Sequence, residues 1–181
     1  MGVAHYISLI PLSVCLFPGE REIISVDEDR YGELIDSLLQ NQENFGIPCS
    51  NLLNTLNIGS LVRLEKVSPV LGTNQISIQI YCTQLFQLTK FYYRHSKGRW
   101  PGGEIREFED SIFTTPLQSN ALVDNTAFQL SAEIHLSLDD RLKLLKFKNT
   151  HQIEQFLEPR KRVYDFSLEQ ELAVTEGFYL N

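Results

Sequence analysis

Residues 75–88 read QISIQIYCTQLFQL, and this stretch decides the fold class. Apolar side chains stand at every second position from Ile76 to Cys82, which is the two-residue period of a strand with one buried face. The turn residues Gly72-Thr73-Asn74 come directly before it, and residues 61–67 read as another strand. We therefore expect a β-hairpin within a β-rich part of the chain.

Two more strands are expected near the N-terminus, over residues 6–10 and 22–26. Between them lies the turn Phe17-Pro18-Gly19-Glu20, in which proline fixes φ and glycine permits a positive φ. We expect this turn to set the reversal between the two strands, which then form a buried pair. The alternative makes Phe17 an exposed anchor for an extended ligand. A further strand over residues 104–108 is expected after the breaker Pro101-Gly102-Gly103.

One helix interrupts these strands. Asp27 can cap its first turn, apolar residues from Tyr31 to Leu39 repeat at helical spacing, and the helix is expected to end near Gln40-Asn41. Residues 1–117 are therefore expected to form a small antiparallel β-barrel or β-sandwich with one packed helix.

The pattern becomes helical after about Pro116. Ser137 can cap a helix over residues 138–147, which has aspartates at its start and lysines towards its end. Asn149 or Thr150 can start a second helix. Residues 118–181 are therefore expected to form a small helical subdomain, which makes the whole chain α+β.

A proline lies inside the second helical pattern. Pro159 is expected to kink or end that helix, because it lacks the backbone N–H and its ring crowds the preceding turn. Ser167 and Gln170 have the spacing of a capping box, which predicts a separate last helix over residues 168–174.

The composition is that of an ordinary folded domain. The chain has 181 residues, 43% of them hydrophobic and 22% charged, and no run approaches the roughly 18 apolar residues of a membrane helix. The apolar segment 6–17 lacks the features of a signal peptide. Cys15, Cys49 and Cys82 are widely spaced, which favours buried thiols in a reducing compartment over a disulfide framework or a zinc knuckle. We expect a cytoplasmic protein.

The net charge of −7 is unevenly distributed. Residues 1–99 carry 8 basic and 9 acidic side chains, whereas residues 100–181 carry 8 and 14. The stretch from Lys66 to Gly103 contains no acidic residue but five basic ones. It can form a local positive face, although the acidic total does not favour attraction of the whole protein to nucleic acid.

Five blocks resemble, in order and spacing, the N-terminal substrate-recognition domain of Lon proteases. They are IPLSVCLFPG (10–19), DRYGELI (29–35), FGI (45–47), IGSLVRL (58–64) and ISIQIYCTQLFQL (76–88). Together they cover roughly residues 6–92, and residues 136–145 resemble more loosely the first helix of the family's helical subdomain. Leu85-Phe86 stands where the family commonly has Arg-Phe, so a contact made by that arginine does not carry over.

The resemblance implies a PUA-like β-barrel or pseudobarrel with an attached helical subdomain. It also implies the capture of unfolded or tagged protein segments. In Lon proteases this domain serves an ATPase and a peptidase, but the present sequence contains no Gly-x-x-x-x-Gly-Lys-Ser/Thr loop to hold a nucleotide. The chain therefore resembles a stand-alone copy of the recognition domain.

No catalytic constellation is apparent in the sequence. There is no Gly-x-Ser-x-Gly motif, and the four histidines lack metal-ligand spacing. A nucleophilic pair of Cys82 with His95 is an open alternative to a buried thiol and a surface imidazole. The acidic run Glu107, Glu109 and Asp110 is more typical of a solvated strand end than of a cation site. We expect no enzymatic activity, no metal and no cofactor.

The segment 90–100, KFYYRHSKGRW, is the strongest candidate for binding. It interleaves basic residues with four aromatic ones, a pattern suited to a peptide contact or to bases and phosphates of RNA. The simpler interpretation is a strand end with alternate rings in the core, followed by a solvated tip. We expect contacts from Tyr93, Arg94, Arg99 and Trp100. A side chain as large and apolar as that of Trp100 has to be covered either by the protein's core or by a partner.

Two partners remain in consideration. We expect unfolded or tagged protein segments, with a protease or chaperone as a further partner and no membrane. A free sheet edge would also serve, because an extended client can add to it as a strand. The rival function is an RNA-binding PUA-like module, whose affinity would fall steeply with salt.

Overall fold

The computed structural model describes residues 5–50, 54–94, 100–107, 131, 133–147 and 149–178. The chain forms two compact units, residues 1–110 and residues 111–181. The expected boundary between residues 117 and 118 lies outside the described residues and stays a prediction.

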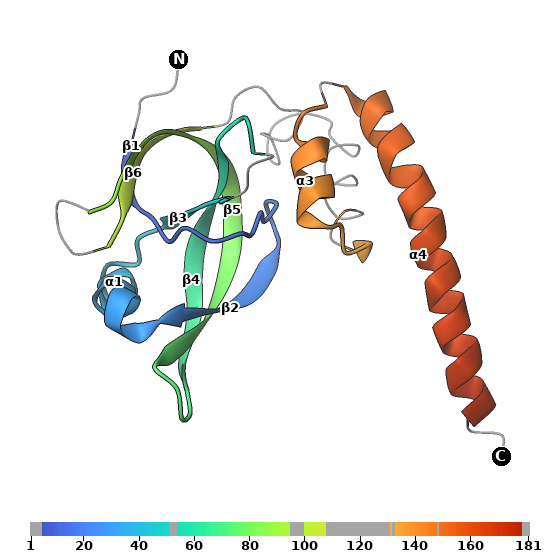
Figure 1. The fold of residues 1–181 in the computed structure, drawn as a ribbon, viewed down its shortest axis with the longest axis horizontal. Coiled ribbons are helices and arrows are strands. Elements are labelled where there is room, and N and C mark those ends of the chain that lie inside the picture. Colours follow the sequence, from blue (N-terminus) through green and yellow to red (C-terminus); the bar gives the residue numbers. More distant parts are fainter. Residues whose placement is uncertain are drawn as a thin grey trace. The chain divides into compact units, whose positions relative to one another are not determined.

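The first unit is built on an antiparallel sheet (Figure 1). Its described strands are β1 (His5–Ser8), β2 (Arg21–Asp27), β3 (Phe45–Pro48), β4 (Ile58–Val70), β5 (Gln75–Tyr92) and β6 (Gly102–Glu107). The order is β1-β6-β5-β4-β3, and β2 also pairs with β5. Isolated parallel bridges join Leu9 to Gly46 and Leu12 to Cys49. The α+β class is confirmed, while closure into a PUA-like barrel stays a prediction.

The hairpin expected around residues 72–74 is present. β4 and β5 pair from Ile58 opposite Gln87 to Val70 opposite Gln75, so both strands are longer than their alternating patterns indicated. Gly72 in the connecting turn has φ +77°, a conformation that side chains with a Cβ rarely adopt. The stretch 75–88 therefore lies in a central strand of the sheet, as its alternating pattern predicts.

The expected pairing of the two N-terminal strands is wrong. β1 pairs with β6 and β2 pairs with β5. The turn between them exists, since Glu20 N donates to Phe17 O at 3.0 Å and Gly19 has φ +94°. Phe17 is fully buried, so it belongs to the core and is not an exposed anchor. The reason is that the partners of both strands lie far away in the sequence, where no local pattern specifies them.

This turn is fastened to the sheet by main-chain and side-chain hydrogen bonds. The buried Ser60 hydroxyl donates to Leu16 O at 2.8 Å and accepts from Leu16 N at 2.9 Å. Gly19 N donates to Cys82 O, and Cys82 N donates to Glu20 O, both at 2.9 Å. The loop that precedes β2 is therefore held against β4 and β5, which places β2 beside β5.

Helix α1 (Glu28–Asn41) begins and ends as expected. The Asp27 carboxylate accepts from Arg30 N at 2.9 Å, which satisfies a free N–H of the first turn. Its apolar stripe is buried in the main core together with residues of the loop and of β2–β5. The buried residues of the stripe are Tyr31, Leu34, Ile35 and Leu38.

The second unit contains α3 (Leu138–Leu144) and α4 (Thr150–Phe178). The Ser137 hydroxyl accepts from Asp140 N at 3.2 Å, and Asn149 Oδ1 accepts from Gln152 N at 2.9 Å. Both predicted helix starts are confirmed. α3 ends somewhat earlier than the expected residue 147.

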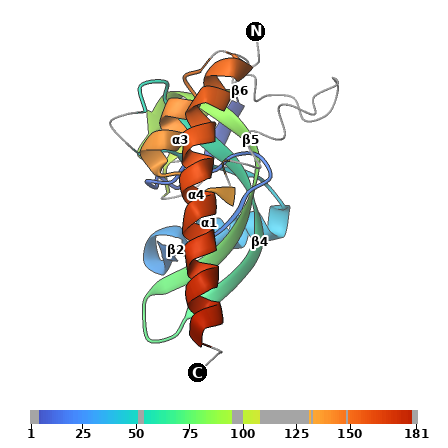
Figure 2. The same cartoon turned by 90° about the vertical axis from the view of Figure 1, so that its right-hand side faces the viewer.

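The helix does not end at Pro159, which was one of the two expected effects of this proline. α4 runs through this proline as one helix, and residues 168–174 form its later turns and not a separate helix (Figures 1 and 2). Near the proline, Arg160 Nη1 donates to Phe156 O at 2.8 Å, and its guanidinium carbon lies 3.6 Å from the centre of the Phe156 ring. These contacts help to hold the turn that the missing N–H weakens.

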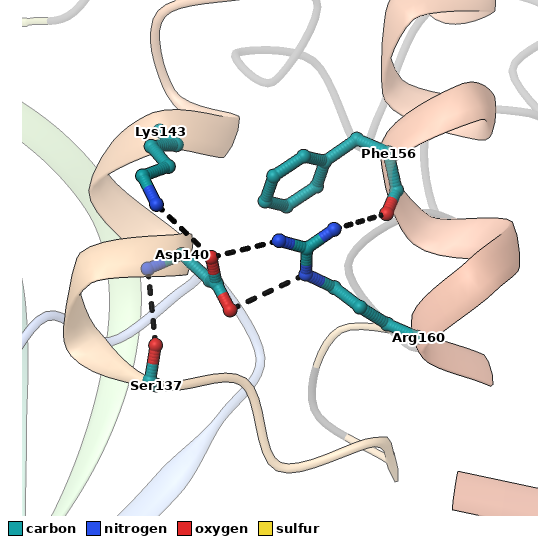
Figure 3. A network of polar contacts seen from close by, with 5 residues as sticks. All are labelled: Ser137, Asp140, Lys143, Phe156 and Arg160. Carbon is teal, nitrogen blue, oxygen red and sulfur yellow. Dashed lines mark hydrogen bonds and ion pairs between the residues drawn. The ribbon is translucent and has the colours of Figure 1, made fainter. Parts of the chain in front are cut away.

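The same arginine joins the two helices (Figure 3). Arg160 binds the Asp140 carboxylate through Nη2 at 3.0 Å and Nε at 3.2 Å, and Lys143 Nζ lies 3.6 Å from it. The hydrogen bond from Arg160 is the main reason why the pKa of Asp140 lies below its usual value. A two-point charged contact of this kind fixes geometry as well as adding attraction.

Candidate binding surface

The basic and aromatic residues that end β5 lie on a three-stranded part of the sheet. Tyr92 contacts the Tyr6 ring of β1 at a centroid distance of 5.6 Å and donates from its hydroxyl to Glu104 Oε1 of β6 at 2.6 Å. Lys90 Nζ lies 4.9 Å from the centre of the Tyr92 ring. Tyr92, followed by the Glu104 carboxylate, raises the pKa of Lys90, so the amine stays charged.

The neighbouring side chains point to the opposite face, as strand geometry requires. Phe91 and Tyr93 meet edge to face with their ring centroids 5.3 Å apart. Tyr93 is 86% exposed and Phe91 36%, and Arg94 is exposed as well. Two of the four predicted contact residues, Tyr93 and Arg94, are therefore accessible. Their role in binding stays a prediction.

The other two predicted contacts differ. Arg99 lies outside the described residues. Trp100 is only 6% exposed, belongs to the main core with Ile10 and Leu16, and donates from Nε1 to the Ser8 hydroxyl at 3.1 Å. The protein's own core covers the indole, which favours a structural role for Trp100, and its predicted role in binding stays a prediction.

Sequence reasoning missed two members of this surface, Tyr6 and Glu104. Both are brought to the end of β5 by strand pairing, since Glu104 lies opposite Tyr6 on one side and Lys90 on the other. No local pattern marks them, because their partners are distant in the chain. We call Tyr6, Lys90, Tyr92 and Glu104 the aromatic cluster.

A second polar group lies where β2, β5 and β4 run side by side. Arg21 Nε binds Glu65 at 3.0 Å, and the Arg21 and Arg63 guanidinium carbons lie 4.8 and 5.2 Å from the centre of the Tyr81 ring. The hydrogen bond from Arg21 is the main cause of the lowered pKa of Glu65. A pocket of about 290 Å³ adjoins Arg63 and is lined by Leu38, Leu39, Gln42, Glu43, Arg63 and Leu64.

The described residues provide no activated nucleophile at the cysteines. Cys15, Cys49 and Cys82 are buried. Burial raises the pKa of Cys49 to about 11 and also raises that of Cys82, which disfavours the reactive thiolate. Among described side chains, no group of three or more His, Cys, Asp or Glu could hold a metal. His95, Glu109 and Asp110 lie outside this part of the chain.

None of the described helices is both long and apolar enough to cross a membrane. The longest one, α4, carries charged side chains along its length.

The fold is that of a Lon N-terminal domain. No protein-family model matches the sequence, and no curated protein matches it either. The chain is similar to the crystal structure of a Lon N-terminal domain protein from Xanthomonas campestris, with a TM-score of 0.61 and 23% identity over 85% of this chain and 98% of that one. It is also similar to the N-terminal domain of Mycobacterium avium complex Lon protease, with a TM-score of 0.60 and 11% identity over 86% and 97%. The resemblance seen in five sequence blocks is thus confirmed as a shared fold.

Proposed function

We propose that this chain is a non-catalytic protein-binding domain that captures unfolded or tagged protein segments, or acts as an adaptor for proteolysis. The observation that carries the proposal is the Lon N-terminal fold, shared with two solved domains over about 85% of the chain. Fold alone does not determine function, so the proposal also needs a surface suited to binding.

The exposed end of β5 supplies such a surface. Tyr93 offers a large ring with 86% of its surface accessible, and Arg94 and Arg99 are expected at its rim. Tyrosine and arginine are enriched among residues that dominate protein interfaces. The aromatic cluster stiffens the strand behind Tyr93, which reduces the conformational entropy that binding would cost.

The second candidate function is RNA binding by a PUA-like module. It is favoured by the acid-free stretch from Lys66 to Gly103 and by the aromatic rings that could stack on bases. The net charge of −7 opposes it, because phosphate contacts dominate the affinity of RNA-binding proteins.

The two functions separate in one binding experiment. A fluorescently labelled, reduced and carboxymethylated lactalbumin, which cannot refold, is titrated with the protein at two salt concentrations, with unlabelled single-stranded RNA as competitor. Saturable binding that resists RNA and salt is expected. Strongly salt-dependent displacement by RNA would favour the second function, and binding to neither would reject both.

A substitution then locates the surface. Tyr93→Ala is expected to weaken client binding by about 1–3 kcal/mol if the ring is an interface anchor. Phe166→Ala is the matched control, because it removes another exposed ring, 60% accessible, from α4 of the second unit. Equal affinities of the two variants would remove Tyr93 from the binding surface.

A further inference from the structure

β2 has one edge that pairs with no other strand in the described part of the chain. Among the described residues β2 pairs only with β5, in unbroken register from Arg21 opposite Tyr81 to Asp27 opposite Gln75. At both ends of this ladder the main-chain groups of even-numbered residues form the hydrogen bonds with the β5 strand. Cys82 N donates to Glu20 O at one end, and Glu28 N donates to Asn74 O at the other. Along an antiparallel strand, the N–H and C=O groups of successive residues point alternately to one side and to the other. The N–H and C=O groups of the odd-numbered residues Arg21, Ile23, Ser25 and Asp27 therefore point away from β5.

The part of β4 that β3 does not cover is a second edge among the described strands, and it carries features that prevent pairing with another chain. β3 covers β4 only as far as Val62, so residues 63–70 also have one side without a described strand. That edge carries Lys66 and Pro69, and its register is shifted between Leu64 and Lys66. Lysine, proline and bulges are the devices that keep edges from pairing with another chain. β2 has no proline, no lysine and no bulge, and its charged residues, Arg21, Glu22 and Asp27, lie towards its ends.

The side chains of β2 add an apolar contact at the middle of the open edge. Ile23 is 66% exposed, a large apolar area for a residue in a regular strand. Its N–H lies 3.4 Å from the Glu22 carboxylate of the same strand, a long contact that an incoming carbonyl can replace.

Charged side chains lie at both ends of β2. Arg21 and Arg63 bind the Glu65 carboxylate at one end, where Glu22 follows Arg21 in the strand. At the other end, Asp27 is followed by the acidic residues that open α1.

We propose that the outer edge of β2 binds an extended polypeptide segment as an added strand. This inference rests on the proposed function and names the place and chemistry of the client. The occupant is an unfolded segment in extended conformation, with an apolar residue opposite Ile23. Only a polypeptide main chain supplies donors and acceptors at the spacing of the edge, which is why the segment's sequence matters little.

Ile23→Pro tests the edge directly. Proline removes the outward N–H and places its ring on the open side, while the bonds to β5 from the even-numbered residues remain. Ile23→Thr is the matched control, because it shortens the apolar side chain but keeps the N–H in a residue that suits strands. Far-UV circular dichroism and the melting temperature establish that both variants are folded.

The probe is the same labelled, carboxymethylated lactalbumin. Ile23→Pro is expected to weaken binding roughly tenfold or more, the equivalent of one or two lost hydrogen bonds with their neighbours, and Ile23→Thr only a few-fold. If the wild-type protein and a folded Ile23→Pro variant bind the probe equally well, the β2 edge is not the binding site, although the proposed function stands. If the wild-type protein does not bind, both are rejected.

A chemical variant of the probe needs no mutation of the protein. An unlabelled nine-residue peptide of alternating valine and threonine is compared, as a competitor of the labelled lactalbumin, with the same peptide N-methylated at every second residue, which removes the donors of one edge. The edge predicts competition with lactalbumin by the first peptide and its loss in the second. Equal competition by both would overturn the inference. So would a wild-type dimer that Ile23→Pro converts to a monomer without changing client binding, because a second copy would then occupy the edge.

Discussion

Replacing the single tryptophan separates a core role from a binding role. Trp100 is 6% exposed and bonded to Ser8. A buried indole removes about 150–250 Å² from water, which at about 25 cal/mol per Å² corresponds to about 4–6 kcal/mol. The unfolded chain already buries part of this area, and measured Trp→Ala costs lie near 3–5 kcal/mol. We therefore expect Trp100→Ala to lower the stability of the first unit by about 4 kcal/mol.

A milder substitution divides this cost. Trp100→Phe keeps most of the apolar area but loses the hydrogen bond and leaves the Ser8 hydroxyl without the indole donor. We expect a loss of about 1–2 kcal/mol. The difference in unfolding free energy between Trp100→Phe and Trp100→Ala then measures the packing of the ring. The difference between the wild-type protein and Trp100→Phe measures the loss of the hydrogen bond together with the change in ring shape.

Urea unfolding is the appropriate assay. In the wild-type protein the one tryptophan reports on the first unit alone, which matters because two units need not unfold in a single transition. The variants lack this probe, so all proteins are also followed by far-UV circular dichroism, and the wild-type tryptophan signal identifies which transition belongs to the first unit. A Trp100→Ala protein within about 1 kcal/mol of wild type, yet weaker in client binding, would refute the core assignment and restore the interpretation as a surface anchor.

Three further outcomes follow from buried or charged contacts. Ser60→Ala should destabilise the first unit by about 2–4 kcal/mol in urea unfolding, because it leaves both main-chain groups of Leu16 without their serine partner. The pKa of Asp140 is lowered in the folded state, so its contribution to stability is present above the unfolded pKa and is lost as pH falls through the folded one. Asp140→Asn should therefore unfold more easily than wild type, by about 1 kcal/mol near pH 7, and the difference should vanish in strong acid. Iodoacetamide should label Cys49 slowly in the folded protein, faster as pH approaches its pKa of about 11, and rapidly in urea.

Signals that act within a few residues could be predicted from the sequence. Asp27, Ser137 and Asn149 each accept from an N–H three residues later, so the cap and its donor lie within one turn. The β4–β5 hairpin is similarly local, because its turn residues and both alternating patterns are adjacent in the chain. These elements were confirmed with only their ends displaced.

Signals that depend on distant partners could not be predicted. His5 of β1 lies opposite Ile105 of β6, and nothing near either residue encodes the other. The sequence predicts that Pro159 kinks or ends the helix, but α4 continues through it, and the contacts of Arg160 with Phe156 and with Asp140 of another helix support the turn around it. Propensity is a weak prior when tertiary contacts of this kind compete with it.

The candidate site shows the same division. The exposure of Tyr93 and Arg94 at a strand end agrees with the polar, basic character of their segment. Trp100 belongs to that segment by sequence but not by structure, since its position is fixed by the core that it enters. The open edge of β2 depends on which strands pair, so it could not be located without the sheet order.

The two proposed contacts are the edge of β2 at Ile23 and the side chain of Tyr93, and both are positioned by strand β5. Their separation along β5 predicts whether they act together in binding. β2 pairs with β5 as far as Tyr81, whereas Tyr93 follows the last residue of β5. Ile23 lies opposite Gln79; the fourteen residues from Gln79 to Tyr93, at about 3.3 Å each, correspond to about 46 Å along the chain, whereas a nine-residue peptide centred opposite Ile23 extends only about 15 Å to either side. A nine-residue peptide docked opposite Ile23 should therefore not reach Tyr93, and Ile23→Pro and Tyr93→Ala should show no coupling in a double-mutant cycle with that peptide. With the long unfolded client, the two sites become linked through one chain, so losing either should reduce the effective concentration at the other. Coupling that appears with the short peptide but not with the long client would contradict this arrangement.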